Sequence, residues 1–217
     1  MSASKRSLPI YSVETNEKKV SFGFNCAWDN TDIPDLIDIL DQKSVKATFF
    51  VSGSWCKKYP ESVKALYDAG HEIGSHSNTH ADLAKLGRDE IIKEIQLCNE
   101  KIEKITGVKP RLFRMPSGSY NDLVIDTIKS QNMTPIQWDC DSIDYKNPTT
   151  EQMNKRIMDK IGNGSIMLFH SGAKNTPAAL PVIIDSVKSK GYIFVTVSEL
   201  IHPEPYTIDI NGRQFKK

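Results

Sequence analysis

Residues 72–106 read EIGSHSNTHADLAKLGRDEIIKEIQLCNEKIEKIT, and this stretch holds the clearest fold signal of the chain. It begins with a short strand-like run at 72–75 and ends in a helix predicted over 88–106, where isoleucines and a cysteine recur at intervals of three and four residues. His76 and His80 lie between the two. The stretch therefore predicts a strand–loop–helix unit whose loop can carry chemistry.

Similar units recur along the rest of the chain. Further strands are predicted by apolar runs at residues 19–25, 47–52, 112–114, 134–138, 165–169 and 192–197. Further helices are predicted by amphipathic stretches at residues 34–43, 60–69, 121–130, 151–161 and 177–190. About seven strands alternating with helices favour a parallel sheet, either open or closed into a barrel. A chain of 217 residues has the right size for one such α/β domain.

Charge and hydrophobicity exclude two kinds of partner. The chain has 28 basic and 27 acidic residues, so its net charge of +1 provides no general attraction to nucleic acid or to anionic membranes. No apolar run reaches the roughly 18 residues that a membrane span requires, so we expect no stable membrane insertion.

The first residues lack the apolar core of a signal peptide. The cysteines form no CxxC pair, and we expect them to be reduced and mostly buried.

Polar side chains directly follow several of the predicted strands. In sheets of parallel strands, catalytic residues gather where the carboxyl ends of the strands meet their loops, so these side chains are expected to be neighbours in space. They are Asn25, His76, Arg114, Asp139, Asp141 and His170.

His76 and His80 are the strongest candidates for metal binding. Their spacing places both imidazoles on one side of a helical turn, where they can reach one metal ion, and zinc prefers such ligands. Two unrelated polar side chains in a loop are the alternative, since this spacing is common by chance. The position directly after a strand favours the metal site.

His170 ends another apolar strand and has two interpretations. It is either a core histidine with a satisfied hydrogen bond or a group that protonates a leaving group beside the metal. Asp139 and Asp141 lie two residues apart after a strand, and one of these carboxylates is suited to hold His170 in its charged form. Otherwise each aspartate is an ordinary turn residue.

Residues 114–120 read RMPSGSY and combine an arginine at a strand end with a loop of Pro, Ser and Gly. Such a loop can direct backbone N–H groups at an oxyanion, and Arg114 can pair with a carboxylate. A tight turn with a surface arginine is the alternative.

Together and in this order, these segments resemble the polysaccharide deacetylases, the family 4 carbohydrate esterases with a NodB homology domain. The similarity covers residues 19–201 and is carried by residues 45–51, 70–76, 114–120, 168–170 and 191–200. The nearest likeness is to the sporulation-type branch of Gram-positive, spore-forming bacteria.

The resemblance implies a fold, a function and a partner. The implied fold is a deformed (β/α) barrel of about seven parallel strands, with an N-terminal extension at 1–18 and a polar C-terminal tail at 202–217 that lies over the surface. The implied function is metal-dependent removal of acetyl groups from an N-acetylated cell-wall polysaccharide, such as peptidoglycan or chitin, by attack of metal-bound water on the amide carbonyl. We expect a monomer that is extracellular or associated with the wall or membrane of a Gram-positive bacterium.

The same resemblance assigns roles around the metal, which is usually Zn2+ and alternatively Co2+ or Ni2+. His76 and His80 match the two metal-binding histidines, and His170 matches the histidine that donates a proton to the departing amine. Asp141 resembles the residue that tunes this histidine, and Arg114 the residue that braces the catalytic base.

Four further positions are implied to bind the substrate. An N–H near Ser117 would stabilise the oxyanion, and Tyr120 belongs to the same loop. Trp138 and Leu168 resemble the walls of the acetyl pocket.

The first motif departs from the family pattern. Most members have Asp-Asp after the first strand, as general base and metal ligand, whereas residues 24–32 here read FNCAWDNTD. Asn25 occupies the base position, and an amide does not take a proton from water near neutral pH. Asp29 or Asp32, further along the loop, is then the candidate for the missing metal ligand.

Three functions stay open at this point. The first, which the retained histidines favour, is an active N-deacetylase in which the metal, His170, Asp29 or Asp32 activates water. The second is a carbohydrate-binding relative without turnover, since loss of a general base commonly lowers rates about a hundred- to ten-thousand-fold. The third is an O-acetyl esterase, for example on acetylxylan, whose better leaving group tolerates a weak base.

Overall fold

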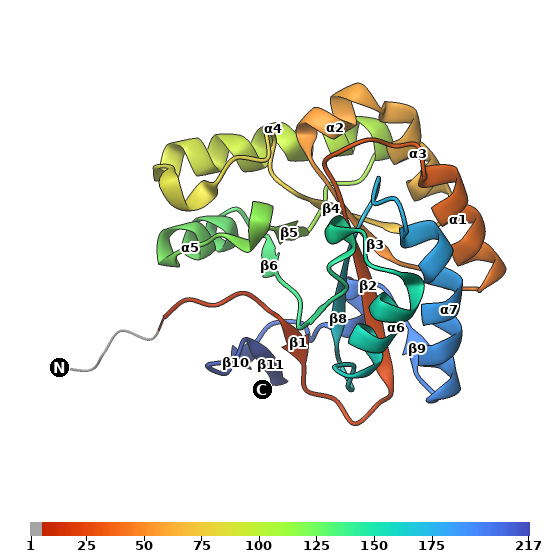
Figure 1. Ribbon diagram of the computed structural model, residues 1–217. Helices are drawn as coiled ribbons and strands as arrows, with labels where there is room; N and C mark the ends of the chain where they lie inside the picture. Colours follow the sequence, from red (N-terminus) through yellow and green to blue (C-terminus); the bar gives the residue numbers. More distant parts are fainter. Residues whose placement is uncertain (1–5) are drawn as a thin grey trace.

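Strand β2 (Lys19–Cys26) lies between β3 and β8 inside the main sheet of the computed structural model, which describes residues 6–217 (Figure 1). The main sheet has the strand order β6-β5-β4-β3-β2-β8-β7, with β9 added to β2, and its neighbouring strands are parallel. The sheet curls into a half-barrel covered by helices. This confirms the predicted deformed (β/α) barrel of about seven parallel strands.

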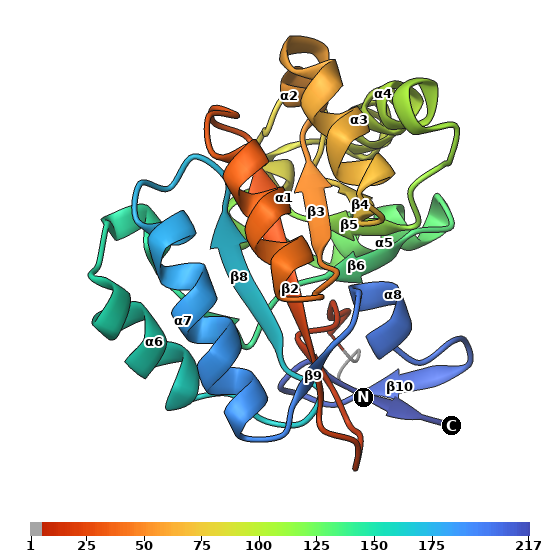
Figure 2. The same cartoon turned by 90° about the vertical axis from the view of Figure 1, so that its right-hand side faces the viewer.

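The other elements follow in chain order. The remaining strands are β1 (Ser12–Val13), β3 (Thr48–Val51), β4 (Glu72–Ser75), β5 (Leu112–Arg114), β6 (Thr134–Ile136), β7 (Cys140–Asp141), β8 (Ile166–His170), β9 (Ile193–Phe194), β10 (Tyr206–Ile208) and β11 (Arg213–Lys216). The helices are α1 (Ile33–Gln42), α2 (Gly53–Lys58), α3 (Pro60–Asp68), α4 (Arg88–Thr106), α5 (Asp122–Ser130), α6 (Thr150–Met158), α7 (Thr176–Ser189) and α8 (Val197–Leu200). Short 3-10 turns occupy Leu83–Lys85, Pro116–Gly118 and Asp144–Lys146. Figure 2 shows α1 and α7 lying over β2 and β8, with α6 beside α7.

The predicted helix over 88–106 agrees with α4 at both ends because local chemistry marks them. The backbone N–H of Gly87 donates to the side chain of Glu90 at the start, and Gly107 adopts a left-handed conformation with φ of 76° at the end. The other predicted elements coincide with observed ones to within a few residues. The short elements β1, α2, β7 and α8 were not predicted, since they are too brief to show a hydrophobic period.

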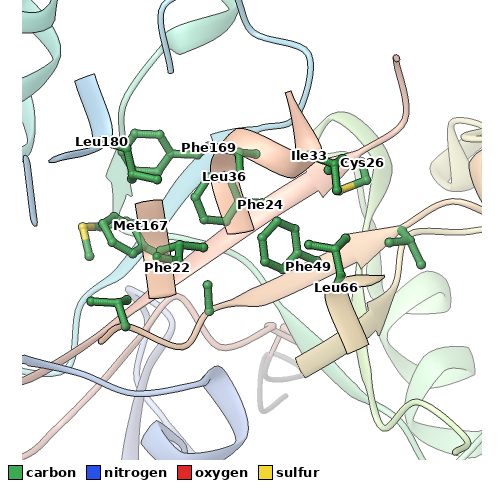
Figure 3. Close-up of a cluster of buried hydrophobic side chains, with 14 of the residues drawn as sticks. Phe22, Phe24, Cys26, Ile33, Leu36, Phe49, Leu66, Met167, Phe169 and Leu180 are labelled. Atoms are coloured by element: carbon green, nitrogen blue, oxygen red, sulfur yellow. The ribbon is translucent and has the colours of Figure 1, made fainter. Parts of the chain in front are cut away.

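The main core fills the space between the sheet and its helices. Aromatic side chains of neighbouring strands pack against one another there, as Figure 3 shows for Phe22, Phe24, Phe49 and Phe169. The rings of Phe24 and Phe49 stack with centroids 4.8 Å apart, and Phe22 meets Phe169 edge to face at 5.3 Å. This apolar layer anchors the strands whose far ends carry the polar residues.

The C-terminal residues form structure that the sequence analysis did not anticipate. The expected tail at 202–217 contains β10 and β11, which pair with each other, and β11 also pairs with β1 in a second sheet of order β1-β11-β10 (Figure 1). Tyr206 and Ile208 pack against a small cluster with Ile10 and Val13, and Gln214 is fully buried. Its amide bonds both the N–H and the carbonyl of His202, so the segment is held in place rather than lying loosely over the surface.

Two expectations from composition can be compared with the described residues. None of their helices has the length and apolar character needed to cross a lipid bilayer. All four cysteines are free and buried, as predicted.

Candidate active site

The concave side of β2 carries the residues of the first motif. Side chains alternate along a strand, so Phe24 and Cys26 enter the core whereas Gly23 and Asn25 face the opposite side. A Cβ at Gly23 would overlap the guanidinium of Arg114. Glycine thus leaves the space in which Arg114 reaches Asn25.

Arg114 ends β5 and is completely buried, so it is not the surface arginine of a simple turn. Its Nη1 donates to the carbonyl oxygen of Gly23 at 3.0 Å and to Oδ1 of Asn25 at 3.2 Å, and its Nη2 donates to the carbonyl of Gln137 at 3.3 Å. Burial lowers the pKa of Arg114 to about 9, which still leaves it charged at neutral pH. Among residues 6–217, no carboxylate forms a salt bridge with this cation.

The bond to Arg114 decides which way the Asn25 amide points. A guanidinium only donates hydrogen bonds, so Oδ1 must face Arg114 and Nδ2 must face away from it. Asn25 lines the cavity of the site, and within the described part of the chain its Nδ2 donates to no other residue. The amide of Asn25 therefore directs an N–H donor into the cavity. A general base at this position would instead direct a hydrogen-bond acceptor there.

The two histidines of the third loop lie together, with ring centroids 5.0 Å apart. They do not share a helical turn, as the spacing suggested. The loop is irregular, and both Ser77 and His80 adopt positive φ, 63° and 62°. The irregular backbone of this loop therefore brings His80 next to His76. The sequence analysis had expected a helical turn to do so.

His76 has the hydrogen-bond pattern of a metal ligand. Its Nδ1 lies 2.7 Å from the carbonyl oxygen of Arg114, and a carbonyl only accepts, so Nδ1 carries the proton. Its Nε2 is then a bare acceptor, buried and without a partner. Burial, and next the proximity of His80, hold the pKa of His76 well below its usual range, and burial also lowers the pKa of His80. Neutral imidazoles are the form that binds metal.

Neither candidate aspartate joins the two histidines. Asp29 accepts hydrogen bonds from the backbone and hydroxyl of Thr31, and Asp32 accepts one from the N–H of Gly172 at 2.8 Å. Over residues 6–217, no group of three or more His, Cys, Asp and Glu side chains is placed to hold a metal ion. This structure does not bring Asp29 or Asp32 to the histidine pair, since Oδ1 of Asp29 is bonded within its own loop and Oδ2 of Asp32 is bonded to Gly172. Among the described residues, a metal ion here would therefore have only two protein ligands, the imidazoles of His76 and His80.

His170 ends β8, and its ring is held by a carboxylate as expected, but by a different one. Nδ1 of His170 lies 2.7 Å from Oδ1 of Asp144, and Oδ2 of Asp144 accepts from the N–H of His170 and the hydroxyl of Thr176. Asp141 instead accepts from the N–H of Ile143. The assignment of Asp141 as the partner of His170 is corrected to Asp144.

Asp144 was missed because it lies in a loop rather than at a strand end. It begins the 3-10 turn Asp144–Lys146 and is fully buried. The other candidate, Asp139, binds Ser165 and the N–H of Ile166 at the opposite end of β8. The sequence does show a third acidic residue after Asp139 and Asp141 that could have been considered. Only the tertiary structure shows which of the three carboxylates contacts His170.

A cavity of about 300 Å³ is lined by Asn25, His80 and His170, whereas His76, Arg114 and Asp144 lie behind its wall and are fully buried. It includes three of the four predicted substrate-binding residues, Ser117, Trp138 and Leu168. Ser117 adopts a left-handed conformation with φ of 54°, a strained geometry for a residue other than glycine. The full lining is Asn25, Ala27, Trp28, His80, Ser117, Trp138, Asp141, Tyr145, Leu168 and His170.

Tyr120 is absent from this lining. Its hydroxyl lies 2.9 Å from the hydroxyl of Tyr11, and Arg6 lies over its ring. The chain turns away from the cavity after Ser119, and Tyr120 thus contacts the N-terminal segment. The prediction that Tyr120 binds substrate is not supported by its position.

Three cavity residues, Ala27, Trp28 and Tyr145, were not predicted. The indole of Trp28 stacks on the imidazole of His170 with centroids 5.0 Å apart and planes at 14°, and Tyr145 meets His170 edge to face at 5.6 Å. Neither contact has a sequence signal, because each joins a loop residue to a strand more than twenty positions away.

Comparison with protein families gives one match, to the polysaccharide deacetylase family over residues 12–136. Among known proteins, the chain is 35% identical to a peptidoglycan-N-acetylglucosamine deacetylase of Bacillus cereus, over 88% of this chain and 92% of the relative. It is 37% identical to the uncharacterised protein YlxY of Bacillus subtilis over 89% of this chain, but spans only 60% of that protein's length.

Among solved structures, a CE4 family pseudoenzyme of Bacillus anthracis superposes with a TM-score of 0.86 at 38% identity, over 89% of this chain and 69% of the other. A mutant of the same pseudoenzyme, described as having restored enzymatic activity, superposes equally well with a TM-score of 0.86. The fold is thus shared by a solved peptidoglycan N-acetylglucosamine deacetylase and by a relative described as a pseudoenzyme.

Proposed function

This chain belongs to the polysaccharide deacetylase family, and from that premise we propose that it binds N-acetylated cell-wall polysaccharide in the described cavity while hydrolysing the acetamido bond slowly at best. The partner is an acetylated glycan such as peptidoglycan, because the Bacillus cereus relative is named as a peptidoglycan-N-acetylglucosamine deacetylase. Such a polymer lies outside the membrane, so the proposed location is extracellular or at the wall.

The orientation of the Asn25 amide is the observation that supports impaired turnover. Hydrolysis of an amide requires a group that takes a proton from the attacking water. The hydrogen bond from Arg114 turns Oδ1 of Asn25 away from the cavity and leaves an N–H donor facing it. A donor can hold an oxygen atom of the ligand, but it cannot act as a base.

The metal is part of the same proposal. His76 and His80 would hold Zn2+, or alternatively Co2+ or Ni2+, and the buried lone pair on Nε2 of His76 supports this. A bound metal would polarise the acetamido carbonyl. Since Cys26 turns into the core and no carboxylate joins the pair, we expect weaker binding than a site with an acidic third ligand has.

The chain's other groups would act on a bound glycan as follows. Trp138 and Leu168 would enclose the acetyl group, and the N–H of Ser117 would donate to the carbonyl oxygen as charge develops on it. His170, oriented by Asp144, would deliver a proton to the departing amine. The proposal therefore places the principal defect at the missing proton acceptor and a second one at the missing acidic metal ligand.

The substitution Asn25→Asp tests this proposal. A carboxylate at this position would accept the Arg114 hydrogen bond and a proton from water, so we expect acetate release from N-acetylated chito-oligosaccharides and peptidoglycan to rise at least tenfold, about 1.4 kcal/mol in barrier. The assay is run with added zinc, and bound metal is measured in parallel.

Two controls make the result specific. Asn211→Asp introduces the same chemical change at an exposed turn and should leave activity unchanged. Adding His76→Ala to Asn25→Asp should abolish the gain if it arises in this cavity. Equal rates for the wild type and Asn25→Asp at equal metal occupancy would show that another group already serves as base.

A further inference from the structure

A second cavity lies at the opposite end of the main sheet from the candidate active site. It is beside the residues that begin β4 and β5, whereas Asn25, Arg114 and His170 lie at or next to the carboxyl ends of their strands. Side chains of α3, β4, α8 and the loop at residues 106–111 line it. Its volume is about 190 Å³, below the roughly 300 Å³ at which pockets for drug-sized ligands begin, so its size suits a small molecule.

His71 contributes a buried hydrogen-bond donor to the wall of this second cavity. The residue is only 3% exposed, and its Nδ1 accepts the backbone N–H of Ala47 at 3.3 Å. Burial lowers the pKa of His71 to about 4, so near neutral pH the ring is uncharged and its one proton lies on Nε2. Among the described residues, this buried Nε2 has no hydrogen-bond partner. A buried donor without an acceptor is unfavourable unless a ligand or a water molecule satisfies it.

Charged side chains of both signs also line the second cavity. Lys109 and Arg111 are exposed, and within the described chain neither forms a salt bridge. Glu72 is half-buried, and its Oε2 accepts the hydroxyl of Thr48 at 2.7 Å and the N–H of Ser198 at 3.2 Å. No described residue donates a hydrogen bond to its Oε1. The cavity therefore offers two unpaired cations and one carboxylate oxygen to a ligand.

Part of the remaining wall is apolar, and its backbone is fixed. Val108 is 52% exposed, one of the few large apolar side chains of the described chain that are, while Ile73 and Pro110 are buried. Oγ1 of Thr106 donates to the carbonyl of Ile102 at 2.9 Å and accepts the N–H of Val108 at 3.1 Å. The apolar wall thus has a defined shape before any ligand binds, and a ligand that covered Val108 would remove apolar surface from water.

A small α-amino acid has the groups that match these side chains. Its carboxylate would accept the Nε2 proton of His71 and pair with Arg111, since a guanidinium donates two parallel hydrogen bonds to a carboxylate. Its ammonium would donate to Oε1 of Glu72, and a short apolar side chain would pack on Val108. A simple carboxylate would leave Glu72 unpaired beside a like charge, and a simple amine would meet the cations of Lys109 and Arg111. The cavity therefore favours a ligand that has both charges.

We propose that the cavity at the amino ends of β4 and β5 binds a free α-amino acid with a small apolar side chain, such as alanine. In this site His71 and Arg111 hold the carboxylate, and Glu72 selects for the ammonium. The site is separate from the candidate active site, and the inference does not depend on the proposed function.

Calorimetric titrations of the full chain with both enantiomers of alanine test the site. We expect at least one enantiomer to bind about tenfold more tightly than propionate, which lacks the ammonium, and than ethylamine, which lacks the carboxylate. Glu72→Gln should lower the alanine affinity about tenfold without lowering the propionate affinity, because the amide keeps an acceptor for Thr48 and Ser198 but loses the charge. Arg111→Gln should weaken the binding of alanine and propionate alike.

Lys104→Gln is the matched control for Arg111→Gln. Lys104 is an exposed cation in the last turn of α4 that does not line the cavity, so its loss should leave the alanine affinity unchanged. The inference is overturned if neither enantiomer binds, or if propionate or ethylamine binds as tightly as alanine. It is equally overturned if alanine binds but Glu72→Gln and Arg111→Gln have no more effect than Lys104→Gln, since the ligand would then lie elsewhere.

Discussion

Arg114 shows how one buried side chain sets the chemistry of its neighbour. Its guanidinium is sealed from water and donates to three oxygens, of which only Oδ1 of Asn25 belongs to a side chain. With an aspartate at position 25, the same bond would brace a base. With an asparagine, the bond fixes a donor toward the cavity. The sequence favoured an active hydrolase, whereas the amide orientation supports the proposal of a glycan-binding protein with little turnover.

The carboxylate that supports His170 leads to a prediction at the same scale. In the Asn25→Asp background, Asp144→Asn should lower kcat at least tenfold with little change in KM, because an amide cannot accept all the hydrogen bonds that Asp144 accepts from His170 and Thr176. Steady-state kinetics of acetate release measures both constants.

Asp141→Asn serves as the matched control for Asp144→Asn. Its carboxylate lines the cavity but bonds only the N–H of Ile143, so a smaller effect on kcat is expected. If Asp141→Asn lowered kcat as much as Asp144→Asn, the sequence-based assignment of Asp141 would be restored.

Among the elements, β2 does most to position the site. It pairs with β3 and β8 in register, so that Asn25 lies beside Phe50 on one side and His170 on the other. The core side chains of the same strand prevent it from rotating, since a change of face would place Asn25 in the core and Phe24 in the cavity. Strand periodicity therefore suffices to predict which of these residues face the cavity.

The turn that precedes β8 allows a test of how β1 is attached to the main sheet. Gly164 adopts φ of 78°, and a Cβ there would overlap the carbonyl oxygen of Val13. Gly164→Ala should therefore lower the free energy of unfolding by at least about 2 kcal/mol, measured by urea denaturation.

A neighbouring glycine provides the comparison. A Cβ at Gly162 would meet nothing within 4 Å, so Gly162→Ala should change stability by no more than about 0.5 kcal/mol. Equal stability of the two variants would mean that the contact of Gly164 with Val13 is not needed.

The stability of the whole molecule depends on buried titratable groups whose pKa values move in opposite directions. Burial lowers the pKa of His71 to about 4, so the unfolded chain binds this proton more readily between about pH 4 and 6.5. His71 thus makes the folded state more stable as pH rises through this window. Burial raises the pKa of Asp32 to about 6, so the folded chain retains that proton, and stability falls as pH rises from about 4 to 6.

Two substitutions should separate these contributions. His71→Gln should reduce the loss of stability on acidification from pH 6.5 to 4, and Asp32→Asn should increase that loss, each by about 1–3 kcal/mol. Urea unfolding at several pH values measures both slopes. Slopes that changed in the same direction for the two variants would contradict the assignment.

The sequence by itself determined the strand and helix order, the position of the histidine pair and the exchange at Asn25. These features depend on hydrophobic period, strand-end placement and residue identity, all of which are local. It also supported the family and the barrel, because several motifs occur in a characteristic order.

Only the tertiary structure decided which groups meet. Asp144 rather than Asp141 supports His170, Asp29 and Asp32 lie outside the histidine pair, Trp28 stacks on His170, and Tyr120 faces the N-terminal segment. The same holds for the C-terminal hairpin, whose strand β11 pairs with the distant β1. Each of these contacts joins side chains or strands through loop conformation and packing, and local periodicity contains no information about them.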